Sequence, residues 1–303
     1  MATAQSGIFA LGTSSHGYLE LNRAKGVRGE VLVHAVADLR EPRTTMGGVN
    51  LVSGFRPELW RDVAPDTMPA DLLGFNEPIA GVDGYSMPAT QHDLWLWIAG
   101  ASNDVVFDMA ARCTGALSAL ATVAEETSSW PYHHDRDLTG FIDGTANPSV
   151  TSAPAAALVP DGWPGAGGSV LLFQKWQHDI DAWTALPTWQ QERVMGRTKD
   201  DSVELEGDLR DPASHVARTD QELDGADLEI FRRNTPYGIV TNHGTMFIGF
   251  ARDQARLARM LARMAGAEDG IRDALTMYAT ALSGSYYWVP SVDALRRFST
   301  PED

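Results

Sequence analysis

The chain has 303 residues, of which 44% are hydrophobic and 21% are charged, a composition typical of a folded globular protein and not of a disordered one. Its 24 basic and 40 acidic residues give a net charge of −16. That charge argues against nucleic acid or an anionic membrane as a partner, because phosphate binding needs clustered Lys and Arg.

The first half of the chain is predicted to alternate strands and helices. Aromatic and β-branched residues predict strands at Gly17–Asn22, Val49–Phe55, His92–Ile98 and Val123–Ser128, with a Pro- and Gly-rich connection between the second and third. Apolar residues at steps of three and four predict helices at Val31–Leu39 and Ser102–Thr122, the latter capped by Ser102 or Asn103. Strand, helix, strand, strand, helix, strand is the order of a ferredoxin-like unit.

The second half repeats this outline after a segment at 149–167 that is rich in Ala, Pro and Gly, which we interpret as a linker. Strands are predicted at Gly168–Trp176, Glu229–Arg232 and Thr245–Phe250, and helices at Asp179–Leu186, Pro187–Val194 and Asp253–Ala265, the last with its arginines on the exposed face. The fold class is therefore α+β. We expect two ferredoxin-like domains with antiparallel sheets, at 1–148 and 149–303.

Cys113 is the only cysteine, which excludes an intramolecular disulfide, an iron–sulfur cluster and a cysteine-rich zinc site. It falls on the apolar stripe of the helix predicted at Ser102–Thr122, so we expect a buried, unreactive thiol. The N-terminus has neither a basic region nor a long apolar run, and no segment approaches the roughly 20 apolar residues that span a bilayer. A cytoplasmic location is the expectation.

The stretch from Gly140 to Pro148 (Gly-Phe-Ile-Asp-Gly-Thr-Ala-Asn-Pro) places one carboxylate, Asp143, on a loop of turn-forming residues. Glycine has no Cβ, so the backbone beside Asp143 can approach a flat ligand closely. The apolar neighbours Phe141 and Ile142 would partly desolvate the carboxyl group, which tunes an acid for proton transfer. The alternative is that Asp143 only caps a turn.

Eight histidines are present, and any one of them taken alone is more often a surface residue than a ligand. The run His133-His134-Asp135 suggests zinc, but adjacent residues on an extended chain point to opposite faces and seldom bind one ion together. His215 differs because of its surroundings. It lies in Asp-Pro-Ala-Ser-His-Val-Ala-Arg, soon after Gly-Arg-Thr-Lys at 196–199 and before Phe-Arg-Arg-Asn-Thr-Pro-Tyr-Gly at 231–238.

The order of these motifs, from about Gly17 to the closing Gly-Ser-Tyr-Tyr-Trp-Val-Pro-Ser at 284–291, resembles the dye-decolourising haem peroxidases. The resemblance is to the shorter bacterial members called the B type. It implies a haem b peroxidase (iron protoporphyrin IX, held non-covalently) with its haem pocket mainly in the C-terminal domain. Such an enzyme reduces hydrogen peroxide and oxidises dyes, phenols or other small reductants by one-electron steps.

By this resemblance His215 is the proximal iron ligand, and Asp273 is the carboxylate that orients its imidazole. Asp143, Arg232 and Asn234 form the distal group. Asp143 relays the peroxide proton, Arg232 stabilises negative charge on the departing oxygen, and Asn234 holds water or peroxide. Arg233, next to Arg232, is expected to point the other way and to lie at the surface.

Four further residues are expected at the haem by the same resemblance. Arg197 pairs with a propionate, Thr145 and Asn147 line the pocket, and Phe247 packs on the distal face while Met246 faces the core. A homo-oligomer is also expected. Two other functions remain open: a haem-binding or haem-delivery protein with incidental peroxidase activity, and a cofactor-free ligand-binding module on the same scaffold.

Overall fold

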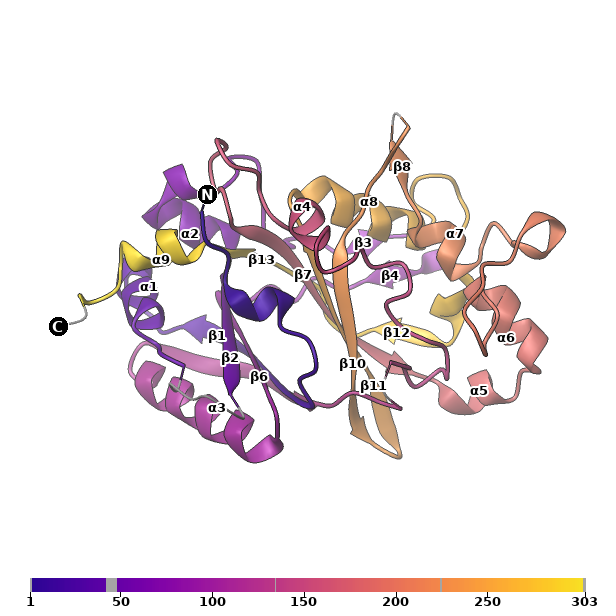
Figure 1. Cartoon of the computed structure of the whole chain (residues 1–303), viewed down its shortest axis with the longest axis horizontal. Coiled ribbons are helices and arrows are strands. Elements are labelled where there is room, and N and C mark those ends of the chain that lie inside the picture. The colour runs from indigo at the N-terminus through magenta and orange to yellow at the C-terminus, as the bar shows by residue number, and fades with distance from the viewer. Residues whose placement is uncertain (1, 42–47, 134, 224, 302–303) are drawn as a thin grey trace.

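The computed structural model describes residues 2–41, 48–133, 135–223 and 225–301. In the N-terminal half the elements agree closely with the predicted order (Figure 1). They are β1 (Ser15–Arg23), α1 (Gly29–Ala37), β2 (Val49–Phe55), α2 (Pro57–Val63), β3 (Ile79–Ala80), β4 (Ser86–Met87), β5 (Leu94–Gly100), α3 (Asn103–Leu117) and β6 (Ala121–Ser129).

The C-terminal half carries more short elements, most of them at the end of the molecule opposite to α1 and α3 (Figure 1). They are α4 (Ala153–Ala157), β7 (Ser169–His178), α5 (Ile180–Thr184), α6 (Thr188–Met195), α7 (His215–Thr219), β8 (Glu222–Leu223), β9 (Ala226–Asp227), β10 (Phe231–Ile239), β11 (Asn242–Ala251), α8 (Gln254–Met264), β12 (Ala279–Ala281), β13 (Ser285–Val289) and α9 (Val292–Arg296).

The main sheet closes on itself. Its strand order in the described chain is β11-β10-β6-β1-β5-β2-β13-β7-β12, and β11 also pairs with β7, so that eight strands form a ring with β12 attached outside. The four strands β6-β1-β5-β2 and the four strands β13-β7-β11-β10 each have the order of a ferredoxin-like unit. Only one residue pair joins the two sets at each seam, Tyr237 with Ser129 and Trp288 with Phe55. All these pairings are antiparallel, which confirms the predicted fold class.

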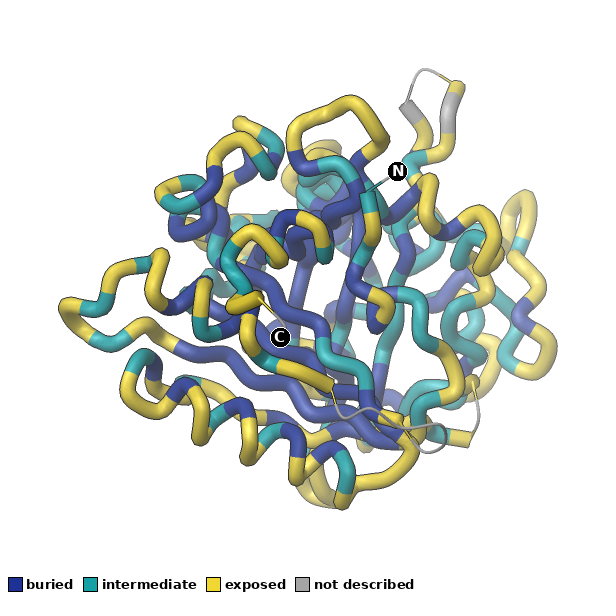
Figure 2. Tube along the Cα trace, turned by 60° about the vertical axis from the view of Figure 1, so that its left-hand side comes forward, coloured by how far each residue is buried: buried dark blue, intermediate teal, exposed yellow. Residues whose placement is uncertain are grey.

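Most strands of the ring are buried, as the dark trace along them in Figure 2 shows, whereas β6 has several exposed residues. Side chains pointing into the ring include the aromatic residues Tyr18, Trp95, Trp97, Phe173 and Tyr287, all at most 2% exposed. The outer face of the N-terminal strands packs against α1, α2 and α3, and α8 covers part of the C-terminal set. Cys113 is buried in α3 as expected. Within the described ranges, none of the helices combines the length and the apolar character needed to cross a bilayer.

Two segments expected to be irregular contain helices. The connection after β2 begins with α2, in which Pro57 occupies the first turn, where its missing N–H is not needed. The segment at 149–167 contains α4, whose Ala153, Ala156 and Ala157 are buried against β10 and β11. It is therefore packed against the sheet and is not a free linker. Small alanine side chains give a weak periodic signal, which is why the sequence did not reveal this contact.

Other boundaries differ for local reasons. Helix α3 ends at Leu117, and residues from Ala121 onward join the sheet. Ser102 stands at the N-cap, but its side chain accepts no capping hydrogen bond. The strand predicted at Glu229–Arg232 instead begins at Phe231 and continues to Ile239 despite Pro236 and Gly238. In α8, Arg256 is buried and donates to Asp253 and to the Glu229 carbonyl, so not all arginines are on the exposed face.

Candidate functional site

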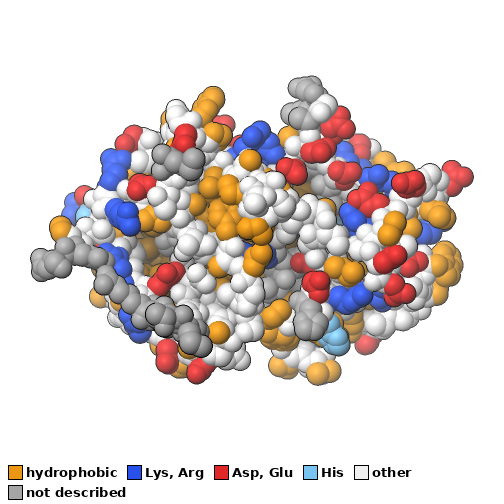
Figure 3. All heavy atoms as spheres, in the orientation of Figure 1, with side chains coloured by type: hydrophobic (Ala, Val, Ile, Leu, Met, Phe, Trp, Pro, Cys, Tyr) orange, Lys and Arg blue, Asp and Glu red, His pale blue; other side chains and the backbone are white. Residues whose placement is uncertain are grey.

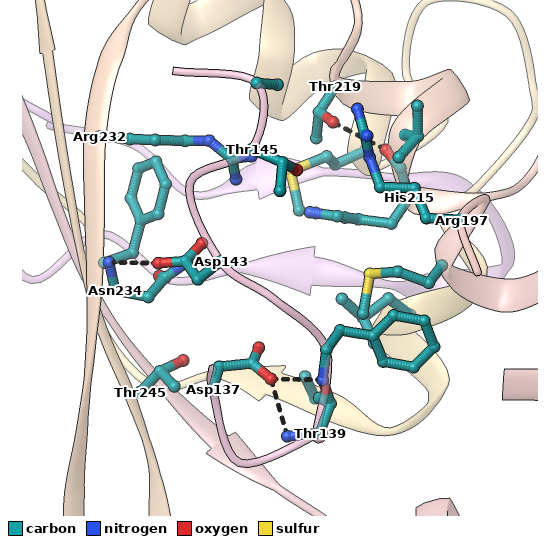
Figure 4. A pocket seen from close by; sticks show the side chains of 18 of the residues that line it. Asp137, Thr139, Asp143, Thr145, Arg197, His215, Thr219, Arg232, Asn234 and Thr245 are labelled. Carbon is teal, nitrogen blue, oxygen red and sulfur yellow. Dashed lines mark hydrogen bonds between the residues drawn. The ribbon is translucent and has the colours of Figure 1, made fainter. Parts of the chain in front are cut away.

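One cavity of about 300 Å³ lies against the outer face of β7, β10 and β11. The loop that carries Asp143 and the helices α6, α7 and α8 complete its walls. Figure 4 shows His215 on one side of this cavity and Asp143, Asn234 and Arg232 on the other. The structure thus brings together the residues that the sequence singled out from segments almost ninety positions apart.

His215 is the first residue of α7, where Ser214 caps the helix by accepting from the Ala217 backbone N–H. Its Nδ1 lies 2.7 Å from Oδ2 of Asp273, which is fully buried. The other Asp273 oxygen accepts the Leu275 backbone N–H at 2.9 Å, so the carboxylate is held at both ends. A proton on Nδ1 leaves Nε2 of His215 with a free lone pair, as required of an imidazole that binds a metal.

Asp143 is held against β10 by Asn234. The Asn234 backbone N–H and side-chain amide donate to the two Asp143 oxygens, each at 3.2 Å. Alternation along β10 places Asn234 and Arg232 on the same face of the strand, toward the cavity. No hydrogen bond or ion pair holds the Arg232 guanidinium among the described residues, so its donors are available to a ligand.

Asn147 does not line the cavity, contrary to expectation. Its side chain instead accepts from the Arg232 backbone N–H at 3.0 Å and donates to the Arg232 carbonyl at 2.8 Å. Because the Asn147 amide pairs with both backbone groups of Arg232, it holds the Asp143 loop against β10. Its contribution to the site is positional.

The other predicted pocket residues Arg197, Thr145 and Phe247 do line the cavity. The Arg197 guanidinium contacts Glu204 and donates to the Ser202 carbonyl at 2.9 Å, and the Ser202 hydroxyl donates to Thr145 at 3.3 Å. The Phe247 ring lies over Gly249, where a Cβ would come within 2.8 Å of it. A side chain at position 249 would therefore displace this ring. Met246 is buried on the opposite face of β11, as expected.

Arg233 is not a surface residue. Because β10 belongs to a closed ring, the face opposite Arg232 points into the protein and not to solvent. The Arg233 guanidinium lies 5.1 Å from the centre of the Trp97 ring and donates to the Ile8 carbonyl at 2.9 Å. Burial lowers the pKa of Arg233 to about 10.

Three polar residues that the sequence did not single out also line the cavity: Asp137, Gln174 and His178. Burial is the main cause that raises the pKa of Asp137 to about 6, and the nearby Asp143 charge acts in the same direction. Burial lowers the pKa of His178 to about 4. The available sequence signal was Gln174, the first polar residue after the apolar run at 170–173 of β7.

The zinc alternative gains no support. His134 lies outside the described residues, and no group of three or more His, Cys, Asp or Glu side chains with metal-binding geometry occurs in the part of the chain that is described.

Comparison with known proteins adds independent information. A family model for the N-terminal part of Dyp-type peroxidases matches residues 28–130, and the model for their C-terminal part matches residues 134–294. A dye-decolorizing peroxidase of Mycolicibacterium paratuberculosis is 35% identical over 269 residues, 87% of this chain and 74% of that protein. One from Rhodococcus erythropolis is 35% identical over 258 residues, 84% of this chain and 75% of that protein.

Solved structures agree with these matches. DyPB from Rhodococcus jostii RHA1 is 34% identical with a TM-score of 0.87, over 96% of this chain and 97% of that one. A variant of the same Rhodococcus protein, solved in complex with heme, is 32% identical with a TM-score of 0.87, over 97% and 99% of the two chains. A dye-decolorizing peroxidase from Bacteroides thetaiotaomicron is 28% identical with a TM-score of 0.89, over 98% of both chains.

Proposed function

Because this chain belongs to the Dyp-type peroxidase family, we propose that it holds haem b non-covalently on His215 and uses Asp143 and Arg232 to reduce hydrogen peroxide. The observation that carries the proposal is the pairing of two arrangements across one cavity. On one wall a buried carboxylate orients the His215 imidazole at 2.7 Å. On the other, Asp143 is fixed by Asn234 beside the Arg232 guanidinium, which has no partner among the residues that the structure describes.

The residues of the cavity fit a haem group. Besides one oriented imidazole, haem needs apolar contacts for its flat faces and cations for its propionates. Met260, Met264 and Phe247 supply apolar wall, and Arg197 supplies a cation. The only cysteine, Cys113, lies in α3 and is not part of the wall, so no thioether link is available. When bound, haem supplies the iron centre at which the peroxide bond is split.

Asp143 and Arg232 have different roles in the reduction of peroxide. Cleavage of the oxygen–oxygen bond needs a proton moved from the inner to the outer oxygen, which a fixed carboxylate within about 3 Å can relay. Asn234 keeps the Asp143 carboxylate turned into the cavity by engaging both its oxygens. Arg232 remains charged throughout and stabilises the negative charge on the departing oxygen.

We also propose the properties that follow from family membership. Hydrogen peroxide is the oxidant, and small organic molecules are the reductants. Residues 1–148 and 149–303 are proposed as the two domains, although the N-terminal and C-terminal family matches meet earlier, between residues 130 and 134, so that the Asp143 loop falls in the C-terminal match. The protein is cytoplasmic, in keeping with its single unpaired thiol, and homo-oligomeric. Sedimentation velocity of the purified protein tests the oligomeric state.

The proposed roles are tested by substituting the proximal ligand. Wild type expressed with haem should be red-brown and should oxidise a phenol only when peroxide is added. His215→Ala should lose haem on desalting, because the single protein bond to iron is gone. Retention of the wild-type haem content in that variant would mean that a different residue binds the iron.

A further inference from the structure

The cavity continues beyond Asp143 to a second group of residues, on the side away from His215. Figure 4 shows Asp137, Thr139 and Thr245 gathered there. The register of the sheet adds Gln174, Trp176 and His178, which alternate on the same face of β7; Thr245 of β11 lies directly opposite Trp176. We call this set, together with Trp183 and Tyr278, the Asp137 subsite.

Two polar atoms in this subsite are buried without a partner. Gln174 is 1% exposed, and its Nε2 has no hydrogen-bond acceptor among the described residues. Nδ1 of His178 is likewise unpaired within that part of the structure, whereas its Nε2 lies 3.3 Å from the Thr245 hydroxyl. An unmade hydrogen bond of a buried group costs about 1–3 kcal/mol. Because Gln174 and His178 line the cavity, a polar ligand bound there would supply the missing partners.

Asp137 supplies the acceptor of the subsite. Its Oδ1 accepts the Thr139 backbone N–H at 2.8 Å and also contacts the Thr139 hydroxyl. Its Oδ2 accepts no hydrogen bond from the described residues, so this oxygen can accept a hydrogen bond from a ligand. Because Thr139 anchors one oxygen, the carboxylate has a fixed orientation at the cavity wall.

The remaining walls are aromatic. Trp183 donates its indole N–H to the Thr139 carbonyl at 2.9 Å, and its ring centre lies 5.4 Å from that of Tyr278, edge to face. Trp176 lines the same part of the cavity and is 8% exposed. These rings are held by the structure itself and present flat apolar surface. A wall of rings with one carboxylate and one amide at its edge suits an aromatic molecule that carries a hydroxyl group.

We propose that the Asp137 subsite binds an uncharged phenol as the reducing substrate and that Asp137 is the base that accepts its proton. The inference rests on the proposed peroxidase function, which supplies the oxidant. With haem bound, the phenolic O–H bond would break in each step: the proton would pass to the Asp137 carboxylate and one electron to the cofactor, which would supply the oxidising equivalents of peroxide. Asp137 would then pass the proton on to the water that forms from peroxide, which returns the carboxylate to its ionised form for the second phenol. The product is a phenoxyl radical, and two phenols are consumed for each peroxide.

Charge favours an uncharged substrate over an anionic one. The chain carries a net charge of −16, and Figure 3 shows acidic side chains crowded over the end of the molecule that carries α6, α7 and β8. The residues that line the cavity include six acidic side chains against two arginines, Arg197 and Arg232. A sulfonated dye would be repelled by these charges, whereas a neutral phenol would not.

Protonation of the groups around the subsite is consistent with this role. The pKa of Asp137 is raised to about 6 by burial and by Asp143, so its carboxylate is mainly ionised at neutral pH and can accept a proton. His178, whose pKa is lowered to about 4, is a weaker proton acceptor than Asp137. His215, the other titratable group that influences Asp137, is engaged by Asp273.

The test compares two electron donors in the haem-loaded enzyme. Guaiacol loses a proton with its electron, whereas ferrocyanide loses an electron alone. Asp137→Asn keeps the shape and the acceptor for Thr139 but removes the base. It should lower kcat/KM for guaiacol by roughly a hundredfold, the smaller end of what general bases contribute. Turnover of ferrocyanide should not fall, because electron transfer alone does not use this base and the variant removes a charge that repels this anion. The rate of reaction with peroxide should stay within about twofold of wild type.

Asp135→Asn is the matched control, because Asp135 lies on the same loop with an exposed side chain. It should leave both donors unchanged. Gln174→Leu provides a second route should Asp137→Asn fold poorly. It removes the unpaired amide and should raise KM for guaiacol with little change in kcat.

Binding supplies a readout independent of turnover. Calorimetric titration of the resting haem-loaded protein with guaiacol, without peroxide, should show roughly tenfold weaker binding in Asp137→Asn, since a charge-assisted hydrogen bond becomes a neutral one. Equal loss of guaiacol and ferrocyanide turnover would assign Asp137 to the peroxide step and overturn the proposal. Unchanged guaiacol kinetics and binding would also overturn it. A wild type that binds guaiacol but never reacts with peroxide would refute the proposed function and leave the subsite intact.

Discussion

Replacing Asp273 with Asn isolates the contribution of the carboxylate behind His215. Both Asp273 oxygens are used, one by His215 Nδ1 at 2.7 Å and one by the Leu275 backbone N–H at 2.9 Å. An asparagine can satisfy only one of these donors. If its oxygen faces Leu275, its NH2 group meets Nδ1 and moves the ring proton to Nε2, which then cannot bind iron. If it turns over, two N–H groups face each other in a fully buried position.

The first arrangement removes the lone pair that binds iron, and the second costs about 1–3 kcal/mol for a buried unpaired donor. About 1.4 kcal/mol corresponds to a tenfold change in affinity. We therefore expect Asp273→Asn to weaken haem binding by roughly 10–100-fold, as is usual for residues that orient a metal ligand. Titration of apoprotein with haemin, followed by absorbance, measures this directly. The haem reduction potential should rise, because a less basic imidazole stabilises ferric iron less.

The control for this prediction is Glu268→Gln, which changes an exposed residue on the preceding loop that pairs with Arg259 and does not touch His215. Its haem affinity and potential should match those of wild type. An Asp273→Asn variant with unchanged affinity and potential would refute the reasoning about the proximal pair.

Three further predictions concern the distal group and the core. Asp143→Asn and Arg232→Leu should each slow the reaction with peroxide at least 100-fold in stopped-flow absorbance, while haem content stays the same, because they act on the bond-breaking step. Asn147→Ala should lower the free energy of unfolding by about 1–3 kcal/mol in urea titrations, since two hydrogen bonds to the Arg232 backbone are lost; an unchanged midpoint would contradict the fastening role. Glu20 is buried, and burial raises its pKa from 4.5 to about 7. Protonated Glu20 is thus favoured by folding, so stability should fall as the pH rises from 4.5 to about 7, by about 3 kcal/mol at about 1.4 kcal/mol per pKa unit. Glu20→Gln should flatten this slope, and an equally steep slope in the variant would assign it to other groups.

The sequence predicted the regular part of the fold because local patterns determine it. Strands such as Val49–Phe55 and helices such as Asp253–Ala265 have a strong period and clear ends, and the structure places them within a few residues. Closure of the ring could not be predicted, since it depends on pairing between β11 and β7 and on two seams of one residue pair each. For the same reason the prediction that Arg233 lies at the surface was wrong. Strand alternation correctly placed its side chain on the face opposite Arg232, but did not show that this face points into the closed ring.

The candidate site divides in a similar way. His215, Asp143, Arg232 and Asn234 stand in segments with a distinctive order, and the structure gathers them around one cavity. Asn147 was expected at the pocket because it lies near Asp143, although a carboxamide can equally well bind a neighbouring strand. Asp137 and Gln174 carry no motif of their own. The position of Asp137 depends on how its loop folds, and that of Gln174 on the register between β7 and β11; neither can be read from the sequence.

The central claim, that one cavity joins a proximal imidazole to a distal acid and guanidinium, is tested most directly by rapid mixing. Haem-loaded wild type mixed with one equivalent of hydrogen peroxide should change its visible spectrum within milliseconds and recover it after two equivalents of a one-electron donor. Asp143→Asn with Arg232→Leu in one chain should bind haem normally and show almost no rapid change. A double variant that reacts as fast as wild type, or a wild type whose spectrum does not respond, would contradict the account.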